Sequence, residues 1–277
     1  MNDPLPPLRE VIERYDLGAK KSLGQHFLLD LNMTRKIARA ASVTETDHVL
    51  EIGPGPGGLT RALLETGARV TAIERDHRCI EALAEVNLAF KNRLIVIEAD
   101  ALTANEAELL GRETPVKIVA NLPYNISTEL LIKWLKAGPA LWSVMALMFQ
   151  KEVADRILAA PGSKAYGRLS VIAQTASLPS RAFNLPARAF TPPPKVDSTV
   201  VVFEQPEEVF PALAALEKVT QAAFSQRRKM LRSSLKPVFG DRLPDALAGA
   251  GIEETQRAEE LTVEQFKALA LSLENSA

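Results

Sequence analysis

Short apolar runs that alternate with helical segments are the feature that most constrains the fold of this chain. The runs end in an acidic residue, an asparagine or a glycine-rich turn, and they cover residues 48–52, 69–74, 94–100 and 116–120. Strands that alternate with helices form a parallel sheet with helices on its faces. Ligands in open α/β sheets bind outside the carboxyl ends of the strands, so we expect these polar groups to meet at one binding edge.

The run at residues 116–120 continues into Asn121-Leu122-Pro123-Tyr124. The Asn121 side chain offers a carbonyl acceptor. Pro123 stiffens the turn and has no N–H, which leaves the Leu122 carbonyl to point outward as a second acceptor. Two acceptors beside the flat Tyr124 ring suit a planar base with an exocyclic amine, which is adenine or cytosine. An ordinary turn is the alternative, because Asn and Pro are common in turns.

Residues 48–52 lead into the glycine-rich run Gly53-Pro54-Gly55-Pro56-Gly57-Gly58. Gly53, Gly55 and Gly58 satisfy the G-x-G-x-x-G pattern of dinucleotide-binding proteins. Glu51 argues against that interpretation, because its carboxylate would repel a pyrophosphate. The two prolines also remove N–H donors that would cradle phosphate. A nearby carboxylate and few free N–H groups better suit a cationic or zwitterionic ligand such as S-adenosylmethionine.

Two further strand ends carry carboxylates. Glu74 closes the run at residues 69–74, where it can accept both ribose hydroxyls of a nicotinamide dinucleotide or of adenosylmethionine. Asp100 closes the run at residues 94–100, where it can accept from the adenine amine of the cofactor. Glu74 thus indicates nucleoside binding without choosing the cofactor, and a solvated strand terminus is its alternative.

Taken in order, these motifs resemble the Rossmann-like methyltransferases that modify exocyclic amines. More narrowly, they resemble the ribosomal RNA adenine dimethyltransferases of the KsgA/RsmA type, over nearly the whole chain. The segments that carry the resemblance are residues 21–28 (KSLGQHFL), 51–60 (EIGPGPGGLT), 121–127 (NLPYNIS), 164–170 (KAYGRLS), 190–198 (FTPPPKVDS) and 226–229 (QRRK).

The resemblance implies an α/β fold, with a Rossmann-like S-adenosylmethionine-dependent methyltransferase domain and a small all-α C-terminal domain. No metal is expected, because the three histidines, His26, His48 and His77, lack metal-ligand spacing. His26 stands where many relatives have Asn, in a position whose family role is contact with the cofactor. Phe190 is expected as a second wall for the target base, with a core aromatic as the alternative. The implied cofactor-binding residues are Gln25, His26, Leu28, Gly53, Gly55, Glu74, Asp100 and Asn121. The implied catalytic residues are Asn121, Leu122, Tyr124 and Phe190.

The implied reaction is dimethylation of N6 of two adjacent adenosines in the 3′-terminal hairpin of 16S rRNA, within an immature small ribosomal subunit. One alternative is the sister group that methylates a large-subunit adenosine; residues 166–170 and the basic C-terminal segment favour the small-subunit type. A non-enzymatic assembly or transcription factor is a second alternative, against which the intact residues 121–124 weigh. A dehydrogenase is a third, which Glu51 and the lack of a recognisable acid–base residue disfavour.

Basic residues cluster near the C-terminus, although the net charge of the chain is only −1. Arg228, Arg232 and Lys236 recur at a spacing of four, so a helix over this segment would align them in a stripe that contacts RNA phosphates. A solvated helix face is the alternative. Lys20, Lys21 and Arg168 would add to a basic rim. The expected RNA-binding residues are Arg227, Arg228, Lys229, Arg232 and Lys236.

The expected organisation is an N-terminal arm over residues 1–30, a catalytic domain over 31–205 and a helical domain over 206–277. The arm carries one helix over residues 8–17. A fifth strand over 143–149 precedes a helix over 151–159, strands over 180–185 and 198–204 close the sheet, and a last helix begins at Thr262. The single cysteine, Cys79, excludes an intramolecular disulfide. With no bilayer-spanning stretch and no signal pattern, it indicates a cytoplasmic protein, expected as a monomer.

Overall fold

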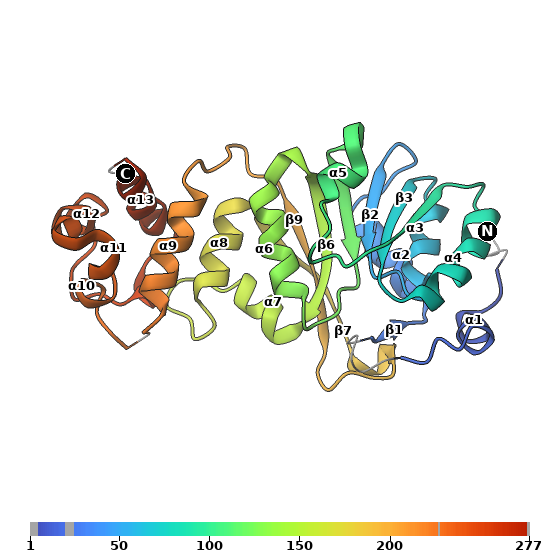
Figure 1. Ribbon diagram of the computed structural model, residues 1–277. Coiled ribbons are helices and arrows are strands. Elements are labelled where there is room, and N and C mark those ends of the chain that lie inside the picture. Colours follow the sequence, from blue (N-terminus) through green and yellow to red (C-terminus); the bar gives the residue numbers. More distant parts are fainter. Residues whose placement is uncertain (1–4, 20–24, 227, 276–277) are drawn as a thin grey trace. The chain divides into compact units, whose positions relative to one another are not determined.

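The computed structural model describes residues 5–19, 25–226 and 228–275 (Figure 1). Lys20, Lys21 and Arg227 therefore lie outside the described residues, as does the start of the segment over residues 21–28. The chain divides into two compact units, of which the first comprises Met1–Ala154 and Ser180–Glu204, and the second Asp155–Pro179 and Gln205–Ala277. In the described part of the chain no helix is long and apolar enough to cross a membrane.

Seven strands form the main sheet of the first unit, in the order β4-β3-β2-β5-β6-β9-β7. They are β2 (His48–Ile52), β3 (Arg69–Glu74), β4 (Leu94–Glu98), β5 (Val116–Ala120), β6 (Trp142–Gln150), β7 (Leu178–Leu185) and β9 (Ser198–Glu204). β2 pairs in parallel with β3 and β5, β3 with β4, and β5 with β6, which confirms the expected parallel sheet. The chain winds from β2 out to β4 and returns on the other side of β2, and this reversal creates the crevice where such sheets bind ligands.

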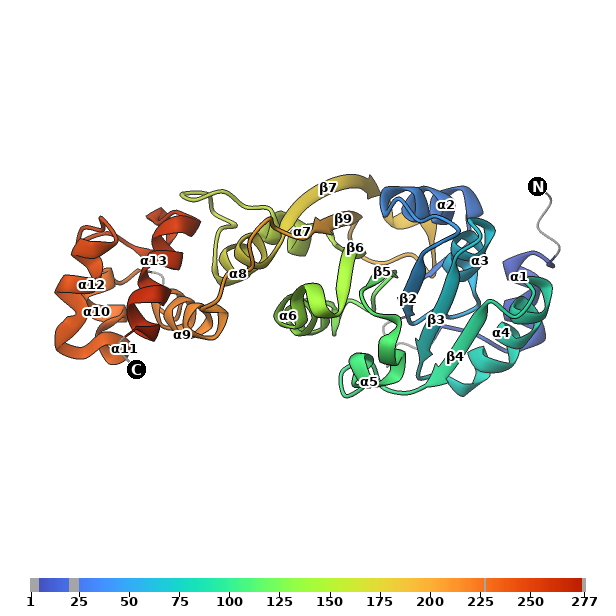
Figure 2. The same ribbon diagram turned by 90° about the horizontal axis from the view of Figure 1, so that it is seen from above.

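Helices cover both faces of the sheet, and Figure 2 shows α2 and α6 on opposite sides of the strands. The helices of the first unit are α1 (Leu8–Arg14), α2 (Leu31–Ala40), α3 (Gly58–Glu65), α4 (His77–Ala89), α5 (Glu106–Leu110) and α6 (Ser127–Ala137), and α7 (Lys151–Ile157) follows β6. Ile37 of α2 and Leu63 of α3 share a buried core with Val49 of β2. On α6 the inward side chains include Leu130 and Trp134, both fully buried.

The N-terminal arm packs against α4. Val11 and Leu17 share a small buried cluster with Cys79 and Ala82 of α4, so the cysteine is a packing residue. The helix expected over residues 8–17 ends at Arg14, because Asp16 adopts a left-handed backbone conformation with a φ of 48°. Such a conformation cannot continue a right-handed helix.

The last strands close the sheet and bring the N-terminal segment to it. β9 runs antiparallel to β6, from the pair Val144↔Glu204 to the pair Gln150↔Ser198, and β7 lies beside β9. The two expected closing strands are therefore present as neighbours. Between them in sequence, β8 (Phe190–Thr191) pairs antiparallel with β1 (Phe27–Leu28) in a separate two-stranded sheet. The segment before α2 is thereby fixed beside the segment before β9.

The second unit is helical and has its own core. Its helices are α8 (Arg168–Ala176), α9 (Leu213–Phe224), α10 (Leu231–Ser234), α11 (Lys236–Phe239), α12 (Leu243–Gly249) and α13 (Val263–Glu274). Tyr166 and Val171 are buried in one cluster with Leu216 and Phe266. Residues 155–179, expected in the catalytic domain, therefore group with the C-terminal helices, because their apolar side chains pack there. α13 begins where expected, with the Thr262 hydroxyl accepting from the Gln265 backbone N–H at 3.2 Å.

The basic residues after α9 do not lie on one helix, which corrects the expected stripe. α9 ends at Phe224, and the described residues between 225 and 229 lie in turns and bends. Arg232 and Lys236 belong to the separate short helices α10 and α11. Pro237 in the first turn of α11 lacks the N–H that a continuous helix would need there. The side chains that are exposed in this segment include Arg228, Lys229, Arg232 and Lys236, so they form a basic surface without helical alignment.

Gly58 allows α3 to approach β1. A Cβ at this position would lie 2.8 Å from the Leu28 carbonyl oxygen and 3.0 Å from Leu8 Cδ1. The carbonyl belongs to the backbone of β1, so it moves only if the strand moves. We expect Gly58→Ala to lower the free energy of unfolding by about 1–3 kcal/mol in urea denaturation. Gly18→Ala is the control, because an added Cβ there meets nothing within 4 Å; similar stabilities for the two variants would contradict the prediction.

Candidate functional site

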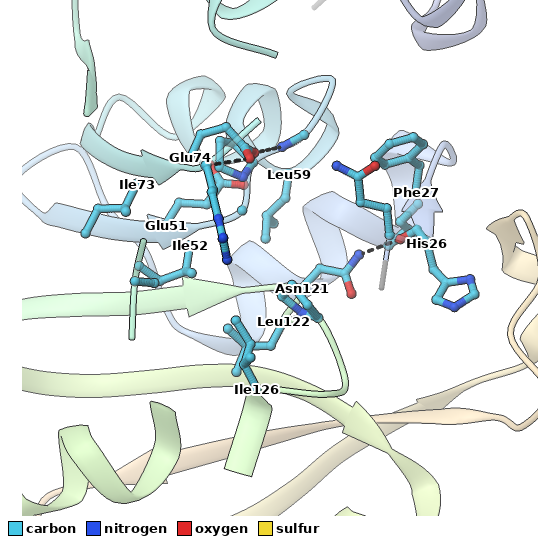
Figure 3. Close-up of a pocket in the computed structure, with 18 of the residues that line it drawn as sticks. His26, Phe27, Glu51, Ile52, Leu59, Ile73, Glu74, Asn121, Leu122 and Ile126 are labelled. Atoms are coloured by element: carbon cyan, nitrogen blue, oxygen red, sulfur yellow. Dashed lines mark hydrogen bonds between the residues drawn. The ribbon is translucent and has the colours of Figure 1, made fainter. Parts of the chain in front are cut away.

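A pocket lies at the carboxyl ends of β2, β3, β4 and β5 (Figure 3). It brings together residues that are far apart in the sequence, from the segment before β1 to the turn after β5. The predicted site residues that line it are Gln25, His26, Leu28, Gly53, Gly55, Glu74, Asp100, Asn121, Leu122 and Tyr124. The binding edge expected from the strand ends is therefore present, with Glu51 also in its wall.

Phe190 is the one predicted catalytic residue that does not line this pocket. Its side chain is 2% exposed and lies in the core of the first unit with Leu28 and Val200. The pairing of Leu28 with Phe190 across β1 and β8 holds it there. Phe190 is therefore a buried core residue in this structure, and its role as a second wall for the base stays a prediction.

The Asn121 side chain is held in one orientation. Its Nδ2 donates a hydrogen bond of 3.1 Å to the His26 backbone carbonyl (Figure 3). A carbonyl oxygen only accepts, so the amide nitrogen must face His26, and the Asn121 Oδ1 is left to accept from another group. This is the acceptor that the sequence motif predicts at the end of β5.

Tyr124 is anchored at its hydroxyl and stacked on one face. The hydroxyl lies 2.7 Å from Ser198 Oγ, and the ring stacks on His26 with centroids 5.5 Å apart and planes inclined by 28°. Burial raises the pKa of Tyr124, so the phenol is neutral at physiological pH. His26 Nδ1 lies 2.8 Å from the Pro192 carbonyl oxygen and must carry the hydrogen of that bond. The Tyr124 ring thus contacts His26 of the N-terminal segment, and His26 in turn bonds to Pro192 in the turn after β8.

Glu74 accepts three backbone hydrogen bonds. Its Oε1 accepts from the N–H groups of Arg75 and Asp76, each at 2.8 Å, and its Oε2 accepts from Gly55 at 3.0 Å (Figure 3). Burial raises the pKa of the Glu74 carboxyl, while the three amides act in the opposite direction. The side chain therefore joins the end of β3 to the glycine-rich turn after β2, where Gly55 has a φ of 56°.

Glu51 is buried without the partners that Glu74 has. Its side chain is 1% exposed, and its Oε2 makes no hydrogen bond to the described residues. Burial, together with the nearby charge of Glu74, raises the pKa of Glu51 to about 8. A buried carboxyl with one unpaired oxygen in the wall of a pocket suits a ligand that carries a cation, because the cation would compensate the charge that burial disfavours.

Asp100 is already engaged on both oxygens. Oδ1 accepts from the Leu102 N–H at 3.0 Å, and Oδ2 lies 3.0 Å from the Arg75 guanidinium. The Arg75 side chain is mostly exposed and lines the pocket. Sequence reasoning did not single out Arg75, although its position directly after Glu74 was an available signal. Phe27 was also missed, and its ring would lie 3.1 Å from a Cβ at Gly55.

The residues of the pocket fit adenosylmethionine. Glu51 offers a buried carboxyl with one unpaired oxygen for the ammonium group, Glu74 lies at the end of β3 where ribose hydroxyls are expected, and Asp100 would present a carboxylate to an adenine amine. No group of three or more His, Cys, Asp or Glu residues that could hold a metal occurs among the residues described.

Comparison with known proteins identifies relatives over nearly the full length. The family model described as "Ribosomal RNA adenine dimethylase" matches residues 17–275. The chain is 56% identical over 275 residues to "Ribosomal RNA small subunit methyltransferase A" of Rhizobium johnstonii, with 98% of each chain covered. It is 58% identical over 273 residues to the protein of the same name from Cereibacter sphaeroides, with 97% of each chain covered.

Two solved structures share the fold. A dimethyladenosine transferase from Plasmodium falciparum superposes with a TM-score of 0.76 at 28% identity, covering 90% of this chain and 98% of the other. The 23S rRNA methyltransferase ErmE superposes with a TM-score of 0.69 at 27% identity, covering 90% of this chain and 99% of the other. These similarities confirm the α/β methyltransferase fold.

Glu51 should couple cofactor binding to proton release. With a pKa of about 8 the free carboxyl is mostly protonated at pH 7, and a bound ammonium group would lower that pKa and release the proton. We expect the affinity for S-adenosylhomocysteine, which keeps the ammonium but lacks the sulfonium, to rise between about pH 6 and pH 8, by up to about tenfold per pH unit.

Isothermal titration in buffers of different ionisation enthalpy measures the proton release directly. Glu51→Gln should abolish both the release and the pH dependence, whereas Glu98→Gln, at an exposed carboxylate, should preserve them. A Glu51→Gln variant that still releases a proton would contradict the assignment.

Proposed function

Because the chain belongs to the ribosomal RNA adenine dimethylase family, we propose that it dimethylates N6 of two adjacent adenosines in the 3′-terminal hairpin of 16S rRNA, with S-adenosylmethionine as methyl donor. The observation that carries the catalytic part of this proposal is the orientation of Asn121. Its amide nitrogen is occupied by the His26 carbonyl, so its Oδ1 is the group that remains to accept from an incoming amine. The names of the similar small-subunit methyltransferases support the choice of substrate.

When bound, adenosylmethionine supplies a methyl group that its sulfonium already activates. The protein must then align a poor nucleophile, since the lone pair of adenine N6 is delocalised into the ring. In our proposal Asn121 Oδ1 and the Leu122 carbonyl accept hydrogen bonds from the N6–H groups as the nitrogen becomes tetrahedral, and these bonds strengthen toward the transition state. In the second transfer one N6–H group remains to donate. Tyr124 stacks on the base. The product nitrogen is acidic and loses its proton without a dedicated general base.

Two successive methyl transfers to one nitrogen set two requirements for the pocket. A second transfer to the same nitrogen requires room for the methyl group already present, and in-line attack requires the base to be held close to the sulfonium. The fixed Asn121 amide and the anchored Tyr124 ring supply that alignment without rearrangement of their own side chains.

We further propose that the substrate particle is an immature small ribosomal subunit, that the enzyme is a monomer and that it is located in the cytoplasm.

The fold does not distinguish the proposed reaction from the sister reaction on large-subunit RNA, because ErmE superposes over 90% of this chain. The curated relatives at 56–58% identity carry the small-subunit name, which favours the 16S substrate. A factor that has lost turnover is disfavoured by the ordered Asn121 and Tyr124 contacts.

Mass spectrometry of digested ribosomal RNA tests the function. Cells without the protein should lack dimethyladenosine in 16S rRNA, the wild-type protein should restore it, and Asn121→Ala should not. In single-turnover assays at saturating cofactor, Asn121→Ala should lower the rate on the order of a hundredfold or more, because the variant lacks one preorganised acceptor.

Glu74→Ala is the matched variant for cofactor binding. It should mainly raise the dissociation constant for adenosylmethionine and change the saturated rate less. Unchanged dimethyladenosine in cells without the protein would refute the proposed substrate, and equal loss of cofactor binding in both variants would refute the division of roles.

The exposed basic residues of the second unit are proposed to bind RNA phosphates. Arg228→Gln with Arg232→Gln should weaken RNA binding and lower the slope of log affinity against log salt by a little under one unit for each phosphate that the variant no longer neutralises. Lys218→Gln with Arg242→Gln, also at exposed positions of the same unit, is the control for the general decrease in positive charge. Filter binding over a salt series measures the slope. An unchanged slope in a folded double variant would show that Arg228 and Arg232 only face solvent.

A further inference from the structure

An ion pair between the half-buried Lys133 and the buried Glu106 joins α6 to the start of α5. Lys133 Nζ lies 2.9 Å from Glu106 Oε1 and 2.8 Å from Glu106 Oε2. The Glu106 side chain is only 4% exposed, and its Oε1 also accepts from the Trp134 indole N–H at 2.8 Å. Removal of Lys133 would leave the buried Glu106 carboxylate without its cation, so the contact links the two elements.

The same ammonium group holds the loop after β4. Lys133 Nζ donates to the backbone carbonyls of Ala101, at 2.9 Å, and Ala104, at 2.5 Å. Two hydrogen bonds to Asp100 form the turn of this loop. The Asp100 backbone carbonyl accepts from the Ala104 N–H at 2.9 Å, and Asp100 Oδ1 accepts from the Leu102 N–H at 3.0 Å. Lys133 therefore donates to the carbonyls of Ala101 and Ala104, which accept neither of the two hydrogen bonds that end on Asp100.

This loop is part of the pocket, whereas Lys133 is not among its lining residues. Asp100, Ala101 and Leu102 line the pocket at the place proposed for the cofactor's adenine. α6 begins at Ser127, shortly after Tyr124, so the helix that carries Lys133 also follows directly from the proposed catalytic turn. The Lys133 side chain thus connects α6 to residues 100–104, which we call the adenine loop.

We propose that Lys133 is a positioning residue for the adenine loop: paired with Glu106, it holds Asp100 where the carboxylate accepts from the adenine amine of the cofactor. This inference rests on the proposed function, because it takes the pocket to bind adenosylmethionine. Lys133 acts through the two backbone carbonyls and does not itself touch the cofactor. Its removal should therefore weaken recognition of the amine and leave the methyl-transfer step at saturating cofactor nearly unchanged.

The test compares two ligands that differ only in the adenine amine: S-adenosylhomocysteine and its purine analogue without the 6-amino group. Wild-type protein should bind the first about tenfold more tightly, as expected for one hydrogen bond to a carboxylate. Lys133→Met should lose about that factor for S-adenosylhomocysteine and little for the analogue, so that the two ligands bind almost equally. Isothermal titration measures both constants.

Three further variants separate positioning from general destabilisation. Lys133→Arg keeps the charge and the donors and should retain most of the discrimination. Lys133→Met with Glu106→Gln removes the stranded buried charge and should show the same loss of discrimination if Lys133→Met alone does not fold. Lys136→Met makes the same substitution at an exposed position of α6 and should bind like the wild type.

Equal loss of affinity for both ligands in Lys133→Met, or full discrimination in the folded double variant, would overturn the inference and leave Lys133 a structural residue. Wild-type protein that binds both ligands equally would overturn it through Asp100. Wild-type protein that does not bind S-adenosylhomocysteine at all would instead contradict the proposed function.

Discussion

The pocket depends on the buried Glu74 carboxylate and the three backbone N–H groups that surround it. Hydrogen bonds to a charged acceptor are stronger than neutral ones, and here they join the glycine-rich turn after β2 to the turn after β3. Oε1 accepts two of them and Oε2 accepts one, so Oε2 keeps an acceptor site for a ligand. The carboxylate can therefore fix the two turns and still bind a ribose hydroxyl, and the strand ends are preorganised before any ligand arrives.

Two glutamates side by side have opposite environments. Glu74 is satisfied by amides, whereas Glu51 has an oxygen with no partner among the described residues and a pKa raised to about 8. Neighbouring carboxyls whose surroundings differ take different protonation states and different roles. In this pocket the Glu74 carboxylate organises the backbone, and the Glu51 carboxyl is expected to ionise when a cation binds beside it. The arrangement explains why a glycine-rich turn with a G-x-G-x-x-G pattern suits a zwitterionic nucleoside and not a pyrophosphate.

The catalytic edge is assembled from segments that are distant in the chain. Asn121 is oriented by the His26 carbonyl, and the His26 ring stacks on Tyr124 and bonds to the Pro192 carbonyl. The pairing of β1 with β8 holds these segments together, and Gly58 gives β1 the space to lie against α3. Lys133 likewise links α6 to the loop after β4, whose residues Asp100, Ala101 and Leu102 line the pocket. Positioning by backbone carbonyls is rigid, because a carbonyl moves only when its whole segment moves.

The sequence alone was sufficient for the parallel strands, for the polar group at each strand end and for the Asn121 to Tyr124 motif, because these follow from local periodicity and residue chemistry. Tertiary structure decided the rest. Phe190 points into the core because β8 pairs with β1, residues 155–179 join the helical unit because their apolar side chains pack there, and Arg228 and Lys236 lie on no common helix. The contact of Lys133 with the adenine loop has no local signal either. Each of these features depends on which distant segment a residue meets, and helical or strand spacing carries no information about that partner.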